Sequence, residues 1–262
     1  MQPAREYHHI GVSLSGPVAT VEMRRPPNNF VDTDMVAELA DAFETFDAQP
    51  ECRAIVLCSE GRHFSAGADF SRRGPDGTPT GGSSGRHLYK EMIRLFRTSK
   101  PVVVAVQGAA VGAGLGLALV GDFRVSCKEA RFVANFTRLG YHPGFGLTVT
   151  LPRVIGAQQT TLLFFTGRRL PGEDAAGIGL VDMLVPEDEV RTRAQAFALE
   201  IAQSAPLAIV ATRETLRRGL ADAVQAASER EFEEQDWLSR TEDFSEGTKA
   251  MAERRLPDFK AR

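Results

Sequence analysis

Two glycine-rich stretches, GRHFSAGADF at residues 61–70 and QGAAVGAGLG at residues 107–116, set the architecture expected for this chain. Each stretch follows an apolar run typical of a buried strand, at residues 54–58 and 102–106. Small residues allow the backbone itself to approach a ligand closely. Two such turns side by side could direct two peptide N–H groups at one oxygen atom. That arrangement, an oxyanion hole, indicates chemistry on a carbonyl group.

The composition argues against several classes of function. The 262 residues carry a formal net charge of −3, so we expect no uniformly basic surface and no nucleic-acid partner. Three cysteines without CxxC spacing favour buried thiols in a reducing compartment over disulfides or a metal site. The first residues include no apolar signal segment, and we therefore expect a cytoplasmic protein.

One apolar run could be mistaken for a membrane span. Residues 102–120 contain no charge and are long enough to cross a bilayer. Gln107 and four glycines interrupt the run, which favours a strand, a turn and a helix instead. We therefore expect no membrane partner.

Hydrophobic periodicity predicts an α/β protein, with a core over residues 1–200 and a helical region over residues 201–262. Residues 71–85 are rich in Gly, Pro, Ser and Thr and predict a surface loop. The strands are expected at residues 7–14, 18–23, 54–58, 102–106, 123–126, 131–134 and 180–185. The helices are expected at residues 33–48, 86–98, 114–120, 147–155, 158–165, 172–177, 187–203, 206–218, 221–239 and 242–254.

The second glycine turn is not a dinucleotide-binding motif. Gly112, Gly114 and Gly116 give the spacing GxGxG rather than GxGxxG, and no acidic residue follows at the expected place. The two turns together, with motifs in the same order along nearly the whole chain, resemble the crotonase family, also called the enoyl-CoA hydratase/isomerase superfamily. The matching segments are residues 25–26, 63–69, 100–102, 108–114, 121–123, 140–144, 151–156, 166–167, 175–181, 241–247 and 253–259.

The resemblance implies a crotonase-like spiral of ββα units with a helical C-terminal trimerisation region. It implies a homotrimer or a dimer of trimers, and an acyl-CoA thioester as substrate, so that coenzyme A is part of the substrate and no separate cofactor is expected. The backbone N–H groups of Ala68 and Ala113 would form the oxyanion hole and stabilise a thioester enolate. For the arginine and the lysine among the contact positions named next, the alternative is a solvated surface charge with no role in binding. The positions implied to contact substrate or CoA are Arg25, Ala66, Gly67, Phe70, Gly112, Phe136, Phe259 and Lys260.

The usual carboxylates of the family are missing. A hydratase of this family needs two glutamates, and this chain has Gly116 and Phe136 in their places. Related members carry an acid or a tyrosine at a position that is Gly144 here. Phe136 should make the acyl pocket drier, which disfavours addition of water. Three functions remain possible on this basis. The protein is an enoyl-CoA hydratase or isomerase, an enzyme of another enolate reaction (decarboxylation or thioester hydrolysis), or a non-catalytic acyl-CoA binder.

His142 is the candidate proton carrier, because it lies on the turn that borders the acyl pocket in this family and imidazole suits acid/base chemistry near neutral pH. A structural hydrogen bond of a loop histidine is the alternative. Weaker candidates and their alternatives are Tyr141 on the same turn, His87 and Tyr89 on a flanking helix, Asp69 and Asp122 as structural aspartates, and His63 as a packing or CoA-contacting residue.

Overall fold

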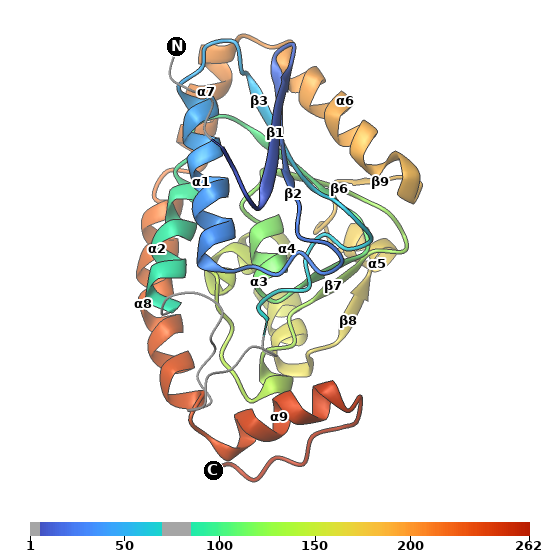
Figure 1. Ribbon diagram of the computed structural model, residues 1–262, viewed down its shortest axis with the longest axis vertical. Helices are drawn as coiled ribbons and strands as arrows, with labels where there is room; N and C mark the ends of the chain where they lie inside the picture. Colours follow the sequence, from blue (N-terminus) through green and yellow to red (C-terminus); the bar gives the residue numbers. More distant parts are fainter. Residues whose placement is uncertain (1–5, 70–84) are drawn as a thin grey trace.

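The computed structural model describes residues 6–69 and 85–262, and a six-stranded sheet runs through their centre (Figure 1). The strand order is β1-β2-β3-β4-β6-β9, in which β1 and β2 pair antiparallel and all other neighbours are parallel. The strands are β1 (Ile10–Ser15), β2 (Val18–Met23), β3 (Ala54–Ser59), β4 (Val102–Val106), β6 (Phe123–Ser126) and β9 (Met183–Leu184). Residues of β3 and β4 are buried throughout, as expected for parallel strands covered on both faces.

A second sheet has three short strands, β5 (Ala109–Val111), β7 (Arg131–Val133) and β8 (Arg169–Pro171). β5 pairs with β7 in parallel, and β7 pairs with β8 antiparallel. Neither β5 nor β8 was predicted. β5 is only three residues long and lies inside a glycine turn, and β8 ends in a proline, so neither carries a strand-like pattern.

The predicted helices are present with small differences at their ends. The expected helices at 147–155 and 158–165 form one segment that is broken at Gly156, where φ is +78°. The helices are α1 (Thr33–Asp47), α2 (Gly85–Phe96), α3 (Ala113–Ala118), α4 (Leu147–Thr166), α5 (Gly172–Gly177), α6 (Val190–Ala202), α7 (Pro206–Leu216), α8 (Leu220–Leu238) and α9 (Glu242–Ala252), with 3-10 turns at Thr137–Leu139 and Glu187–Glu189.

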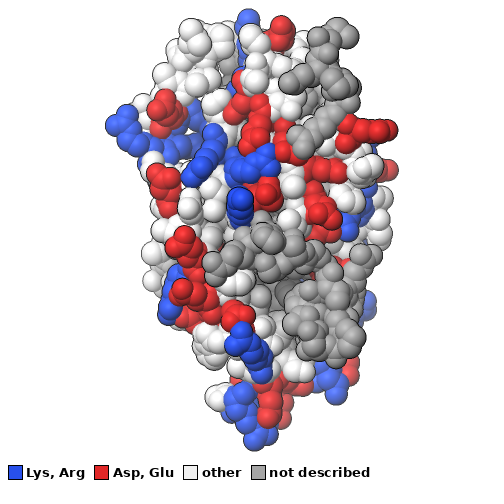
Figure 2. Space-filling view, turned by 60° about the vertical axis from the view of Figure 1, so that its left-hand side comes forward, with Lys and Arg blue, Asp and Glu red and all other residues white. Residues whose placement is uncertain are grey.

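Helices cover the six-stranded sheet from two sides. α6 packs on β2, β3, β4 and β6, while α1 packs on β1 and β2 and lies on the opposite flank in Figure 1. α2 packs on α1, and α8 packs on α2, which builds a helical layer along that flank. Arg94 of α2 joins this layer through ion pairs of 2.6 Å with Asp41 and Glu44 of α1. Acidic and basic side chains are intermixed on this side of the molecule (Figure 2).

The uncharged run at residues 102–120 resolves into β4, β5 and α3, which confirms a strand, a turn and a helix. No single helix in the described ranges is long and apolar enough to cross a membrane, and only the pair Glu187–Ala202 and Pro206–Leu216, bent by 104°, meets those criteria together. The three cysteines are buried free thiols, as expected, and burial raises the pKa of Cys58 to about 11.

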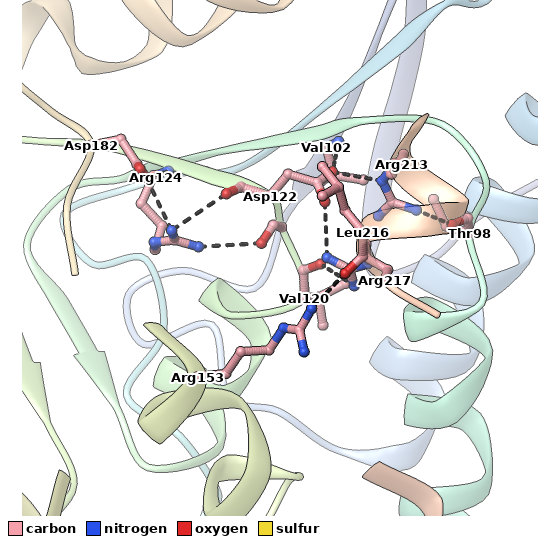
Figure 3. Close-up of polar contacts among 11 residues, drawn as sticks. Thr98, Val102, Val120, Asp122, Arg124, Arg153, Asp182, Arg213, Leu216 and Arg217 are labelled. Atoms are coloured by element: carbon pink, nitrogen blue, oxygen red, sulfur yellow. Dashed lines mark hydrogen bonds and ion pairs between the residues drawn. The ribbon is translucent and has the colours of Figure 1, made fainter. Parts of the chain in front are cut away.

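Asp122 anchors helix α7 to the sheet (Figure 3). Its carboxylate accepts a hydrogen bond from the Val102 N–H at 2.8 Å and pairs with Arg213 at 2.8 Å and Arg217 at 2.9 Å. Burial and the neighbouring Arg213 lower the pKa of Arg217 to about 10. The contacts place Asp122 in a structural role, since one carboxylate joins β4 to α7 and to the residue that follows it.

Gly108 allows the two glycine turns to touch. Its φ is +60°, and a Cβ atom there would lie 2.1 Å from the Arg62 carbonyl oxygen.

We expect Gly108→Ala to lower the free energy of unfolding by at least about 2 kcal/mol, because the cost of a left-handed conformation and the cost of a backbone clash add together. Urea unfolding measures the change. Gly16→Ala is the control, since Gly16 has φ +55° and no atom within 4 Å of such a Cβ. Equal losses at both positions would contradict the close approach.

Candidate active site

A short backbone ladder holds the two glycine turns together. The Phe64 N–H donates to the Gln107 carbonyl at 2.9 Å, and the Ser65 N–H donates to the Ala109 carbonyl at 2.9 Å. The Val111 N–H returns a bond of 3.0 Å to the Ser65 carbonyl, so that Ser65 and Ala110 form a parallel bridge. The residues that follow on each side, 66–68 and 111–113, are thereby brought next to each other.

Gly67 is a second point of close approach between the two turns. Its φ is +83°, and a Cβ atom there would lie 2.5 Å from the Val111 carbonyl oxygen and 3.6 Å from the Ala113 nitrogen. The orientation of this glycine is fixed on both sides, because its N–H donates to Ser65 Oγ at 3.1 Å and its carbonyl accepts from the Val31 N–H at 2.9 Å. Only glycine fits this backbone conformation and this spacing.

The two predicted donor groups have no hydrogen-bond acceptor among residues 6–69 and 85–262. Ala113 is the first residue of α3, where a backbone N–H has no partner within the helix. Its neighbour Gly112 donates instead to the Val133 carbonyl at 2.9 Å. Neither the Ala68 N–H nor the Ala113 N–H donates a hydrogen bond to any residue in the described ranges.

Two aromatic rings lie close to α3 and to the glycine that precedes it. The Phe136 ring, 7% exposed, lies 3.6 Å from the position of a Cβ atom at Gly112. One turn further along the helix, a Cβ atom at Gly116 would lie 2.7 Å from a ring carbon of Phe145. Sequence reasoning identified Phe136 but missed Phe145, because nothing in the pattern of residues 140–146 marks that side chain as facing α3.

His142 is half-buried on the turn that leads to α4. Its Nδ1 lies 2.7 Å from the Pro143 carbonyl oxygen. Because a carbonyl oxygen only accepts, Nδ1 must carry the proton, and Nε2 of the neutral ring therefore carries the lone pair. The His142 carbonyl accepts a bond of 2.9 Å from the Gln235 side chain of α8. The turn and the tautomer are thus both fixed by local contacts.

Helix α8 supplies polar groups that sequence reasoning missed. Glu231, 1% exposed, accepts hydrogen bonds from the Gly146 N–H at 2.8 Å and the Thr148 N–H at 3.1 Å, so it caps the start of α4. Gln235 accepts a bond of 2.7 Å from the hydroxyl of Tyr89. The segment EREFEEQDW looks like a solvated charged face, and only the four-residue spacing of these two side chains hinted otherwise.

Burial shifts the titration of two of these groups. It raises the pKa of Tyr89 well above its ordinary value of 10, so the hydroxyl stays protonated. It also raises the pKa of Glu231, opposed by the hydrogen bonds from Thr148 and Gly146. Tyr89 and Glu231 therefore act here as hydrogen-bonding groups in a dry environment.

The remaining predicted residues have other partners. The Arg25 guanidinium pairs with Asp32, whose other oxygen caps α1 by accepting from the Met35 N–H at 2.9 Å. Ala66 donates its N–H to the Asn28 carbonyl at 2.8 Å. His63 Nδ1 accepts from the Ala109 N–H at 3.3 Å, and it braces the second turn; burial lowers its pKa.

The C-terminal tail folds back on its own helix α9. The Lys260 N–H donates to Asp243 at 2.6 Å, and its ammonium pairs with Asp258 at 2.8 Å, while Phe259 is 39% exposed. A contact of Phe259 or Lys260 with CoA in a neighbouring subunit stays a prediction. Phe70 and the His87 side chain lie outside the described residues.

The sequence and the fold both place the chain in a known family. A family model described as enoyl-CoA hydratase/isomerase matches residues 14–262. The chain therefore belongs to the enoyl-CoA hydratase/isomerase family, the crotonase superfamily. A solved structure, carnitinyl-CoA hydratase from Mycobacterium avium, superposes with a TM-score of 0.86 at 29% identity, covering 97% of this chain and 99% of that chain. This similarity confirms the crotonase-like α/β fold.

Two curated relatives are of similar length. The chain is 31% identical over 266 residues to carnitinyl-CoA dehydratase of Salmonella typhi, with 97% of this chain and 98% of that protein aligned. It is 32% identical over 248 residues to 1,2-epoxyphenylacetyl-CoA isomerase of Escherichia coli (strain K12), with 92% and 94% aligned. These relatives carry names of different reactions, so similarity at this level identifies the family but not the reaction.

The raised pKa of Glu231 predicts a pH-dependent stability. The unfolded carboxyl ionises near its ordinary pKa of 4.5, whereas the buried one ionises at higher pH. Its contribution is therefore fully present below pH 4.5 and is lost as pH rises through the folded-state value. We expect the unfolding free energy of the wild type, relative to Glu231→Gln, to fall as pH rises from 4.5 to 7.5 in urea titrations. Glu229→Gln, on the exposed side of α8, controls for net charge. A pH-independent difference would contradict the prediction.

Proposed function

We propose that this protein binds acyl-CoA thioesters and stabilises the thioester enolate with the backbone N–H groups of Ala68 and Ala113. One observation carries the proposal: the ladder between the turns leaves these two N–H groups without partners among the described residues, with Ala113 N 3.6 Å from the Cβ position of Gly67. Two donors that are fixed before the reaction stabilise developing negative charge without reorganising. The relatives named for CoA thioesters support this substrate class.

The proposed reaction begins with removal of a proton from the carbon next to the thioester. His142 Nε2 takes this proton, and the C–H electron pair forms the enolate, whose oxygen is held by the two N–H groups. The same imidazolium returns the proton to the acyl chain. The tautomer supports this role, because the Nδ1–H is committed to the Pro143 carbonyl and the lone pair of the neutral ring is on Nε2.

We do not propose addition of water, because Gly116 and Phe136 supply no carboxylate to orient or activate it. Proton shift along the acyl chain is the enolate reaction that needs the fewest groups, while decarboxylation and thioester hydrolysis are alternatives. The missing carboxylates also favour a second candidate, a non-catalytic acyl-CoA binder. In the proposed complex CoA lies along Ala66, Gly67 and Phe70, and Arg25 and Gly112 also contact it. The proposed assembly is a homotrimer or a dimer of trimers.

Exchange of the α-protons of butyryl-CoA in D₂O separates these candidates. The acyl chain of butyryl-CoA has no carbon–carbon double bond. Loss of its α-proton signal by ¹H NMR therefore reports enolate formation alone. We expect the wild type to catalyse the exchange, and His142→Ala to slow it about 10²–10⁴-fold, as is typical of a lost acid/base group. His8→Ala, at an exposed histidine, is the control. Binding of butyryl-CoA without any exchange would favour the non-catalytic binder.

Ala113→Pro tests the backbone donor directly. Proline removes the N–H but suits the first position of a helix. The residue before it, Gly112, has ψ −116°, which is the mirror image of the extended values that usually precede proline. Glycine has no Cβ atom and can adopt either form, so proline fits after it. We expect the exchange rate to fall about 10²–10³-fold, as for removal of one oxyanion donor. Thr33→Pro, at the first position of α1, is the matched control and should keep the wild-type rate. Unchanged exchange in a folded Ala113→Pro variant would exclude this N–H as a donor.

A further inference from the structure

Phe145 has an unusual conformation for a buried aromatic residue. Its φ is +61°, in the left-handed region that favours glycine, and its side chain is 1% exposed. The surroundings must therefore hold the residue in place, because a non-glycine residue does not adopt this conformation without compensation. Residues with such backbone strain are concentrated at functional sites, which directs attention to what Phe145 touches.

Two helices hold this turn by its backbone. The Tyr89 hydroxyl of α2 donates a hydrogen bond to Gln235 of α8 at 2.7 Å. The Gln235 amide donates to the His142 carbonyl at 2.9 Å, and Glu231 accepts from the Gly146 N–H at 2.8 Å. We call Tyr89, Glu231 and Gln235 the turn clamp. α2 and α8 lie against each other along one flank (Figure 1), so the clamp is part of a packed layer.

The ring of Phe145 fills the space in front of Gly116. A Cβ atom at Gly116 would lie 2.7 Å from the ring and 3.0 Å from the Phe145 carbonyl oxygen. Gly116 donates its N–H to the Gly112 carbonyl, so it lies one helical turn from the Ala113 donor and on the same side of α3. The ring therefore takes up the volume into which a side chain at 116 would project beside the donor.

The clamp also leaves no room for a side chain at Gly144. A Cβ atom at Gly144 would lie 2.3 Å from both the Tyr89 hydroxyl oxygen and the Gln235 amide nitrogen. The Tyr89 hydroxyl donates to the Gln235 side chain, whose amide nitrogen donates in turn to the His142 carbonyl. Two phenylalanine rings, Phe136 and Phe145, lie close to Gly112 and Gly116 on either side of the Ala113 donor.

We propose that Phe145, positioned by the turn clamp, is a specificity-determining residue that restricts the site to acyl groups without a polar substituent on the β-carbon. This inference rests on the proposed function, because it assumes that the thioester oxygen lies at Ala113. An apolar pocket disfavours a hydroxyl group that finds no hydrogen-bond partner, by up to about 10²-fold. The substrate class is therefore plain acyl-CoA or enoyl-CoA thioesters, and 3-hydroxyacyl-CoA is discriminated against.

Calorimetric titration with CoA, butyryl-CoA and 3-hydroxybutyryl-CoA tests the selectivity. The wild type should bind butyryl-CoA at least 10-fold more tightly than 3-hydroxybutyryl-CoA. Phe145→Gly, which suits the left-handed backbone and removes the ring, should bring that ratio to within about 3-fold of one, with CoA affinity changed less than 2-fold. Phe145→Leu keeps an apolar side chain and should retain most of the discrimination. An unchanged ratio in Phe145→Gly would overturn the proposal.

A second measurement tests the packing independently of any ligand. In the wild type, Gly116→Ala should lower Tm, because the added methyl group meets the Phe145 ring. In the Phe145→Gly background the same substitution should lower Tm by less than half as much, since the ring is gone and only the backbone carbonyl oxygen of residue 145, 3.0 Å from the added Cβ atom, stays in place. An equal loss of Tm in both backgrounds would overturn the packing of 145 on 116. If neither thioester binds more tightly than CoA while the loss of Tm is reduced in this way, the proposed function fails and the packing stands.

Discussion

The parallel bridge between Ser65 and Ala110 is the interaction on which the candidate site depends. Through it the Ser65 backbone bonds to both Ala109 and Val111, so two segments more than forty residues apart in the sequence follow a common path. The N–H groups of Ala68 and Ala113, which have no hydrogen-bond acceptor within the part of the chain that the structure describes, come just beyond this ladder. Because both are main-chain groups, their direction is fixed by the fold itself. The identity of the side chains there matters mainly through size, which explains alanine and glycine at these positions.

Small residues on α3 are matched by large ones on the segment that faces it. Gly112 stands opposite Phe136, and Gly116 stands opposite Phe145. Both pairs fill the space beside the glycines with apolar volume. In such low-dielectric surroundings an N–H dipole acts more strongly on a nearby negative charge than it would in water. In the proposed function, the main-chain donors stabilise an anion and Gly116 and Phe136 offer no carboxylate that would handle water.

The C-terminal helices help to fix the shape of the candidate site. Glu231 and Gln235 on α8 satisfy backbone groups on either side of Phe145, and Asp122 secures Arg213 of α7 to β4 (Figure 3). Buried polar groups of this kind specify one arrangement, because an unsatisfied partner would be costly. The shape of the site is therefore set jointly by the sheet, by α2 and by helices that lie more than two hundred residues along the chain.

The sequence by itself determined the elements and the family. Apolar runs predicted β3 and β4, and Asp32 and the apolar stripe after it predicted α1. Glycine spacing located both turns, because these signals act between residues that are neighbours in the chain. Only the tertiary structure decided what surrounds the donors. β5, the buried face of α8 and the ring of Phe145 depend on contacts such as Tyr89 with Gln235, 146 residues apart, and no local pattern encodes such a pairing. The charged segment of α8 that contains Glu231 and Gln235 is typical of a solvated surface, but in the folded chain these two side chains are buried and hydrogen-bonded to the backbone of the turn. Their burial depends on the tertiary structure and not on the local sequence.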